Sequence, residues 1–249
     1  MRFSVFLVFA GVLAGAVAGG TAQADFVNGG FEAATTLTNW NVHGSAQIVT
    51  ASFGKTPPAG VRQAYLDNDQ QNGAVDVAVL EAALLLPAGE LSGGTLAATS
   101  GSAISQTVTA TANQGVQFSW DFLTAEDPTL SPSNDFSFAV VRNTTTNVAT
   151  VTVLGDYAHA NIPLPFNGTL PSPSTDDYLS ETGYGQTTLA FGGAGTYEVS
   201  FGVANRVNKT VASALLVDKV AVVPEPGSAS LLTLAGFALA IRRRKARTA

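Results

Sequence analysis

The chain of 249 residues is 46% hydrophobic and 12% charged, with 25 Gly, two His and no Cys. So few charges argue against a helical bundle, whose solvent faces need Lys, Glu and Arg, and favour a β-protein. The lack of Cys excludes disulfides, thiolate metal sites and a Cys nucleophile, while His43 and His159 are too few for a three-His zinc site. The net charge of −6 argues against nucleic acid as a partner.

Residues 1–24 have the pattern of a secretory signal peptide. Arg2 gives a positive start, residues 3–18 are almost wholly apolar, and Ala22 and Ala24 are the small residues that signal peptidase requires. We therefore expect export by the Sec route and cleavage before Asp25, rather than an uncleaved membrane anchor.

Residues 25–222 show the alternation of apolar and polar side chains that predicts half-buried strands. The clearest case has Val116, Phe118, Trp120 and Phe122 at alternate positions. Strands are predicted at 46–50, 61–66, 103–110, 116–122, 136–140, 147–154, 186–191, 197–203 and 211–223. Short strands separated by Gly, Pro and Asn predict an all-β domain, an antiparallel sandwich or jelly roll.

Residues 76–86 break this alternation. Leu80 and Leu84 lie at helical spacing, Asp76 stands at the N-cap position, and Pro87 follows the last residue. The segment predicts one short helix lying over a sheet edge.

The C-terminal residues 223–249 combine a rigid spacer, an apolar run and a basic end. Pro224-Glu225-Pro226 is followed by 13 uncharged apolar residues at 229–241 and then by an arginine cluster that contains Arg242, Arg243 and Arg244. A helix of that length spans about 20 Å, less than the ~30 Å hydrocarbon core of a bilayer. Such a short hydrophobic helix suits a segment that the membrane holds transiently before processing.

This order of parts resembles the PEP-CTERM sorting signal. The resemblance implies that Pro224, Glu225 and Pro226 are read by an exosortase, a membrane-embedded transpeptidase-like enzyme, and that the inner membrane holds the tail at least transiently. It also implies a Gram-negative bacterium that makes extracellular polysaccharide, and a final place at the cell surface or in the extracellular matrix of a biofilm. The alternative is an ordinary C-terminal transmembrane helix.

Without its two ends the chain is strongly acidic. Residues 25–223 keep six basic and 17 acidic residues, a formal charge of −11. An anionic polymer would be repelled by such a body, whereas neutral sugars and divalent cations would not.

The start and end of the body resemble carbohydrate-binding-module jelly rolls of the galactose-binding-like type. The resemblance rests on residues 28–32, Asn-Gly-Gly-Phe-Glu, with Trp40 after them, and on residues 215–222 as a closing strand. It implies a structural calcium ion between the first and last strands, with Glu32, Asp218 and Asp25 as ligands. The alternative is that these carboxylates are turn and hairpin residues.

Sugar sites stack a sugar ring on an exposed aromatic residue and add polar partners. Tyrosines near loops are the candidate platforms, and among them Tyr178 and Tyr184 share a region with Asp176 and Asp177, whose carboxylates accept hydroxyl hydrogen bonds. The other two platform candidates are Tyr65 and Tyr157.

Other conspicuous residues favour structural roles. Trp120 falls in phase with the core positions Phe118 and Phe122, and Trp40 follows a turn and is expected to pack beneath the first strand. Glu126, Asp127 and Asp135 flank a Pro- and Ser-rich stretch typical of a solvated loop. No Gly-x-Ser-x-Gly elbow or phosphate-binding loop is present. We therefore expect a non-enzymatic, polysaccharide-associated binding or structural protein. The alternatives are a secreted hydrolase of matrix glycans and a purely structural matrix protein without a specific ligand.

Overall fold

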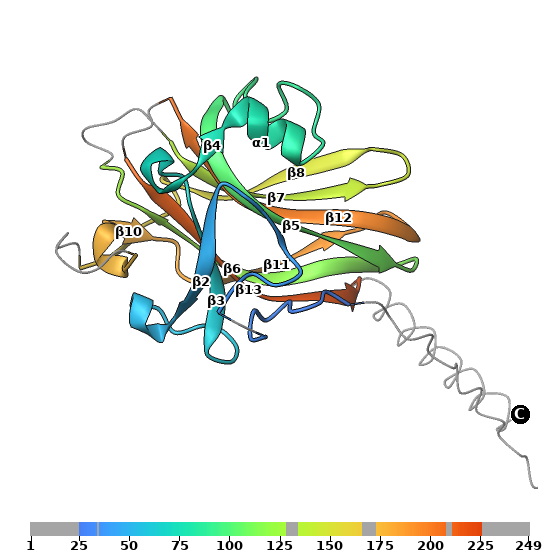
Figure 1. Cartoon of the computed structure of the whole chain (residues 1–249), viewed down its shortest axis with the longest axis horizontal. Helices are drawn as coiled ribbons and strands as arrows, with labels where there is room; N and C mark the ends of the chain where they lie inside the picture. Colours follow the sequence, from blue (N-terminus) through green and yellow to red (C-terminus); the bar gives the residue numbers. More distant parts are fainter. Residues whose placement is uncertain (1–24, 34, 128–133, 166–172, 208–210, 226–249) are drawn as a thin grey trace, which may run out of the picture.

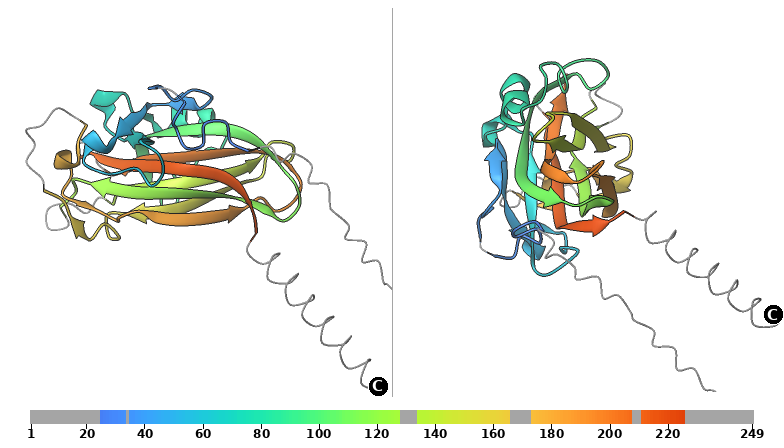
Figure 2. Two further views of the ribbon diagram at one scale, coloured as in Figure 1. Left: turned by 90° about the horizontal axis from the view of Figure 1, so that it is seen from below. Right: turned by 90° about the vertical axis from the view of Figure 1, so that its right-hand side faces the viewer.

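The computed structural model describes residues 25–33, 35–127, 134–165, 173–207 and 211–225. Two antiparallel sheets pack face to face in a β-sandwich of jelly-roll type, with one short α-helix outside them (Figures 1 and 2). The predicted fold class is thereby confirmed. Within the described ranges, no helix is both long and apolar enough to cross a bilayer.

The first sheet, sheet A, has six strands in the order β1-β5-β12-β7-β8, with β4 also paired to β5. Their bounds are β1 Asn41–His43, β4 Val75–Asp76, β5 Ala98–Ala110, β7 Phe136–Asn143, β8 Ala149–Asp156 and β12 Gly195–Arg206.

The second sheet, sheet B, has seven strands in the order β2-β3-β13-β6-β10-β9, with β11 also paired to β6. Their bounds are β2 Ser45–Thr50, β3 Arg62–Asp67, β6 Gln114–Thr124, β9 Ile162–Pro163, β10 Ser180–Glu181, β11 Gly185–Ala190 and β13 Ser213–Pro224. Each of the nine strands predicted from alternation overlaps one of these strands.

The main core lies between the sheets, where alternate side chains of facing strands meet. Phe118 of β6 and Phe201 of β12 are fully buried, with ring centroids 4.6 Å apart. Trp40 is 6% exposed and packs on Phe201 and on the two Phe residues of the N-terminal segment, so the prediction that it is a core residue is confirmed. Phe and Trp bury large apolar areas, so these aromatic residues contribute much of the stability of the core.

Helix α1, Val77–Ala83, covers the outer face of sheet A. Leu80 and Leu84 are buried there against Phe138 and Val140 of β7, as the helical spacing predicts. Asp76 does occupy the N-cap position, but its side chain makes no cap hydrogen bond and accepts from the Gln70 amide instead. Packing of the leucines, rather than capping, therefore holds this short helix in place.

The start of the body lies against its last strand. The Val220 amide donates to the carbonyl of Gly29, and the Val222 amide donates to Asp25 Oδ1. A Cβ at Gly29 would lie 2.0 Å from the Val220 carbonyl oxygen, so only glycine permits this approach. Within the described residues, the three buried apolar clusters consist of residues between 26 and 222, so this core lies inside residues 25–225.

Candidate ligand-binding face

The outer face of sheet B carries most of the polar chemistry of the domain. On β3, Gln63, Tyr65 and Asp67 alternate with the core residues Ala64 and Leu66 and therefore point away from the sandwich. The segments 51–61 and 173–184 lie over this face and bury it, as the contacts below show. Much of this face is thus a covered surface.

An apolar cluster holds these covering segments down. Phe53 packs on the Tyr65 ring with centroids 5.2 Å apart, and the Tyr65 and Tyr178 hydroxyls share a hydrogen bond of 2.7 Å. Tyr65 is 2% and Tyr178 1% exposed. Burial raises the pKa of both phenols, so both stay neutral.

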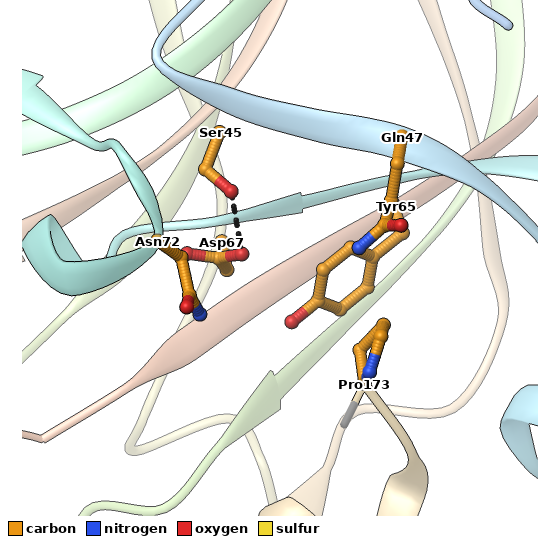
Figure 3. Close-up of a pocket in the computed structure, with 6 residues that line it drawn as sticks. All are labelled: Ser45, Gln47, Tyr65, Asp67, Asn72 and Pro173. Carbon is orange, nitrogen blue, oxygen red and sulfur yellow. Dashed lines mark hydrogen bonds between the residues drawn. The ribbon is translucent and has the colours of Figure 1, made fainter. Parts of the chain in front are cut away.

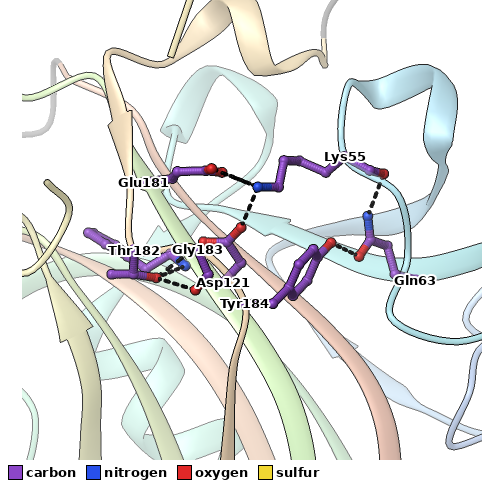
Figure 4. Close-up of polar contacts among 8 residues, drawn as sticks. Lys55, Gln63, Asp121, Glu181, Thr182, Gly183 and Tyr184 are labelled. Atoms are coloured by element: carbon purple, nitrogen blue, oxygen red, sulfur yellow. Dashed lines mark hydrogen bonds and ion pairs between the residues drawn. The ribbon is translucent and has the colours of Figure 1, made fainter. Parts of the chain in front are cut away.

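Beside this cluster, a half-buried lysine joins two buried carboxylates (Figure 4). Lys55 Nζ lies 3.2 Å from Asp121 Oδ2 and 2.6 Å from Glu181 Oε2. Thr182 donates to the other oxygen of Asp121, at 3.1 Å. Burial, with the charge of Glu181 added to it, raises the pKa of Asp121 to about 7. Burial alone would lower the pKa of Lys55, but the two carboxylates outweigh it and raise that pKa.

Two further contacts hold Lys55, one through its side chain and one through its backbone. Its ammonium lies 5.3 Å from the centroid of the Tyr184 ring, a cation–π contact. The Tyr184 hydroxyl donates to Gln63 Oε1, and Gln63 Nε2 donates back to the Lys55 carbonyl at 3.4 Å (Figure 4). Segment 51–61 is therefore held to sheet B through both the side chain and the backbone of one residue.

Two pockets open near this face. One, of about 260 Å³, lies between β2, β3 and residues 72 and 173 (Figure 3). In it Ser45 donates to Asp67 Oδ2 at 2.7 Å, and the amides of Gln47 and Asn72 are exposed. Burial raises the pKa of Asp67. This pocket offers a carboxylate, a hydroxyl and two amides, but its aromatic residue, Tyr65, is buried.

The second pocket, of about 270 Å³, combines an aromatic ring with polar groups. The half-buried Tyr157 lines it together with Glu126, Asp127, the half-buried Ser180 and the exposed Asn161. Tyr157, Tyr184 and Trp120 are the half-buried aromatic residues in the described part of the chain. Because Lys55 covers Tyr184 and Trp120 points inward, Tyr157 is the platform candidate that this structure leaves beside a pocket.

The predicted sugar-binding residues 176–178 are engaged in local structure. Tyr178 is buried and presents no ring face to solvent, so it does not serve as a stacking platform in this structure. Asp176 is 9% exposed, and Asp177 accepts from the Ser174 amide in a capping box. The alternation pattern of the sequence cannot reveal the burial of these residues, because they are buried by packing on sheet B.

Two of the three predicted calcium ligands converge on one loop. Glu32 Oε1 accepts from the amides of Val61 and Arg62, and Asp218 Oδ2 accepts from the amide of Ala59, each at 2.8 Å. Burial raises the pKa of Asp218 to about 6, and the charge of Glu32 adds to this. Asp25 stands apart from that loop and accepts from the Phe26 and Val222 amides.

These oxygens face N–H donors, an arrangement that does not suit a cation. Calcium requires six to eight oxygen ligands. In the described residues, no group of three or more His, Cys, Asp and Glu side chains is placed to hold a metal ion. Calcium binding through Glu32, Asp218 and Asp25 therefore stays a prediction, and it would require loop 59–62 to move.

Two of the three acidic residues that flank segment 128–133 are buried. The prediction that Glu126 and Asp135 belong to a solvated loop is therefore wrong. Asp135 is fully buried and Glu126 is 1% exposed. Asp135 accepts hydrogen bonds from the side chains of Asn68 and Ser213 and from the amide of Arg206. Burial and the charge of Glu126 raise the pKa of Asp135 to about 7. A composition typical of a loop concealed a polar network that joins both sheets.

The sorting motif is described only at its beginning. Pro224 ends β13, and the Glu225 amide donates to the Asn113 carbonyl, so these two residues continue the last strand of the body. Pro226, the arginines at 242–244 and the signal peptide 1–24 lie outside the described residues.

Sequence reasoning missed Lys55, Gln63 and Glu181 as members of the buried cluster. Lys55 stands alone between Gly54 and a Pro-Pro pair, a position typical of a surface turn. The one available signal is its rarity, because residues 25–223 contain only six basic residues against 17 acidic ones.

The two facing antiparallel sheets define the chain as a jelly-roll β-sandwich. No family model and no curated protein sequence matches the chain. Similar solved structures include TmCBM61 in complex with β-1,4-galactotriose, with a TM-score of 0.41 and 10% identity, covering 80% of this chain and 97% of that one.

Two further structures are similar. The CBM22-1 xylan-binding domain of Paenibacillus barcinonensis Xyn10C has a TM-score of 0.35 and 13% identity over 81% of this chain and 96% of that one. The K1 cleaved adhesin domain of Lys-gingipain from Porphyromonas gingivalis has a TM-score of 0.34 and 10% identity over 76% and 92%. Similarity this distant carries no argument about a ligand or an activity.

Proposed function

We propose that this chain is a non-enzymatic, polysaccharide-associated protein, exported by the Sec route and sorted by an exosortase to the cell surface or the extracellular matrix. Its body binds neutral glycan chains in the Tyr157 pocket. The observation that carries the binding proposal is the arrangement of that pocket, where a half-buried tyrosine ring lies beside an amide, a hydroxyl and a carboxylate. Sugars are recognised by this combination of an apolar ring face and hydrogen-bonding groups.

The charge of the body supports a neutral rather than an anionic glycan. With a formal charge of −11 over residues 25–223, the domain repels acidic polymers at low ionic strength. Asp127 and Glu126 add negative charge at the pocket itself.

The arrangement of the buried carboxylates Asp121 and Glu181 argues against hydrolysis of glycans at this cluster. Asp121 and Glu181 are two carboxylates within reach of one ammonium group. However, Lys55 Nζ occupies the space between them, and the Asp121 side chain has no exposed surface. A glycosidase needs an open position between its two carboxyl groups for the glycosidic bond. We therefore assign this cluster to holding segment 51–61.

Binding is tested with residues 25–225 on an array of neutral and acidic glycans. We expect neutral glycans to bind, Tyr157→Ala to abolish binding and Tyr157→Phe to retain it, because the phenyl ring keeps the stacking face. Asn72→Ala, in the other pocket, reports whether that pocket takes part, and the exposed neighbour Gln71→Ala is its matched control. Absence of binding to any neutral glycan would contradict the proposal and favour a purely structural matrix protein. Equal binding by the Tyr157→Ala variant would refute the Tyr157 pocket as the binding site.

Sorting is tested separately with a reporter that carries signal peptide 1–24 and tail 223–249. In a Gram-negative host that has an exosortase, we expect delivery to the cell surface and a shift in mass when the tail is processed. Replacing Pro224, Glu225 and Pro226 with alanine should leave export intact and abolish processing. A reporter that stays in the cytosol would refute export, and processing that ignores the triple substitution would refute recognition of this motif.

A further inference from the structure

One edge of sheet A is a strand that carries no charge before its last residue, Asp156. Among the described strands, β8 is the last of the order β1-β5-β12-β7-β8 and pairs only with β7 (Figure 1). Residues 143–155, which include nearly all of β8, contain no Asp, Glu, Lys, Arg or Pro. Natural edge strands usually carry such residues, since an unprotected edge pairs with other chains. In a body with a formal charge of −11 this uncharged stretch stands out.

The ladder with β7 determines which backbone groups of β8 point outward. The Asn143 amide donates to the Val148 carbonyl, so hydrogen-bonded pairs with β7 fall on residues 148, 150 and 152. The N–H and C=O groups of Ala149, Val151 and Val153 therefore point away from the sheet. A shift in the register beside Val153 ends the regular edge, so the free stretch is residues 149–153.

The side chains of this stretch are complementary to a second copy of themselves. About a two-fold axis through Val151, an antiparallel pair sets Val151 opposite Val151, Ala149 opposite Val153, and Thr150 opposite Thr152. The residues with outward N–H and C=O groups then fall in hydrogen-bonded pairs, each of which exchanges two bonds. Thr–Thr and β-branched cross-strand pairs stabilise antiparallel sheets.

The surface beside this edge is apolar as well. Val153 is 41% and Val148 65% exposed, and Leu85 and Val79 on or beside α1 are 61% and 56% exposed. Leu85 and Asn147 line one shallow groove of about 570 Å³ between α1 and the hairpin that joins β7 to β8. An apolar surface continuous with a free strand edge is the combination that strand addition between copies buries.

We propose that residues 25–225 form a two-fold symmetric dimer by antiparallel pairing of β8 with β8 of a second copy, which joins the two A sheets into one. The occupant is a second copy because the stretch is complementary to itself in backbone, side chains and charge.

The experiment measures the mass of residues 25–225 in solution, by light scattering and sedimentation, at concentrations up to about 1 mM, the weak limit of specific association. We expect a dimer, and at least about a tenfold increase in its dissociation constant for Val153→Lys. The matched control is Val42→Lys on β1 at the opposite edge of sheet A, where Val42 is 43% exposed. Thr150→Lys is a second variant should Val153→Lys fail to fold.

The register is tested directly, because the chain has no Cys. Val151→Cys should form a disulfide-linked dimer under mild oxidation, since Cα atoms of a hydrogen-bonded antiparallel pair lie about 5.5 Å apart, within disulfide range. Val42→Cys should stay monomeric on a denaturing gel. A monomer at every concentration, a dimer unaffected by lysine at either β8 position, or a dimer that Val151→Cys does not cross-link would each overturn the proposal.

Discussion

Lys55 and Asp121 are 66 positions apart in the chain, and the ammonium of one lies 3.2 Å from a carboxylate oxygen of the other. Both side chains are largely withdrawn from water, with 17% and 0% exposed. Glu181 joins them from a third segment, at 2.6 Å from the same ammonium. One cation thus holds together a loop, the central strand β6 and the short strand β10, and it stabilises the segment that covers the outer face of sheet B.

Removing that cation should destabilise the domain. Lys55→Met leaves Asp121 and Glu181 buried next to each other, and breaking one partner out of a buried pair costs about 3–5 kcal/mol. We expect a loss of about 3 kcal/mol in the free energy of unfolding at pH 8, measured by urea denaturation. Adding Asp121→Asn and Glu181→Gln to the same chain should recover most of the loss. A loss of less than about 0.5 kcal/mol, as for an exposed ion pair, would contradict this role.

The stability of the domain should fall as the pH rises from 5 to 8. Asp135 and Asp121 have a pKa of about 7 in the folded state, against an ordinary value of 3.8. The folded state therefore binds protons that the unfolded state releases, and this contribution is complete below pH 4 and lost as the pH passes 7. Glu81 and Asp156, whose pKa is lowered, lose their contributions only in acid below this window.

Calorimetry across this range should show a higher Tm at pH 5 than at pH 8, by about 2–4 °C for each kcal/mol. Asp135→Asn removes one of the titrating groups and should flatten the profile, whereas Glu90→Gln at an exposed position should leave its shape unchanged. A Tm that rises between pH 5 and 8 would show that these carboxylates are already ionised in the folded state.

The loop that follows α1 should depend on Glu81. Its carboxylate is 4% exposed and accepts from the amides of Leu91 at 2.7 Å, Ser92 at 2.8 Å and Gly89 at 3.1 Å. Burial alone would raise its pKa, but these N–H groups outweigh burial and lower it. Glu81→Ala leaves the amides without an acceptor, and we expect a loss of about 2–3 kcal/mol.

Glu81→Gln is the matched variant for this prediction. Leu91 and Ser92 share Oε1, so the remaining amide oxygen of Gln can serve both and only the bond to Gly89 is lost. The glutamine variant should therefore retain more than half of the stability that alanine loses. Because Gln has nearly the same volume as Glu, equal losses for both variants would mean that one neutral acceptor oxygen is not sufficient and that the site requires the charge or both oxygens of the carboxylate.

Calcium binding is decided by thermal unfolding with added Ca²⁺ and with a chelator. If an ion binds the folded state through Glu32, Asp218 and Asp25, the Tm should rise with free calcium by mass action. Asp218→Asn should abolish that increase. Identical curves with ion and chelator would dismiss calcium and leave the carboxylates as acceptors for the amides of loop 59–62.

The sequence alone determined the two-sheet architecture and its core. The period-two pattern around Phe118 locates a core strand, the spacing of Leu80 and Leu84 marks the helix, and Trp40 falls in the core as predicted. These are local properties, because the period of side-chain burial is set by backbone geometry over a few residues.

Only the tertiary structure decided which polar side chains are covered. The sequence predicts Tyr178 to be a loop residue, but it is buried. Asp135 is predicted to be solvated, but it lies inside a hydrogen-bond network. The partners of Lys55 are Asp121 and Glu181, which are distant from it in the chain. Each of these results depends on strand order and on how distant segments lie across a sheet. Pairing over such separations is set by the packing of the whole domain, on which the pattern of any single segment carries no information.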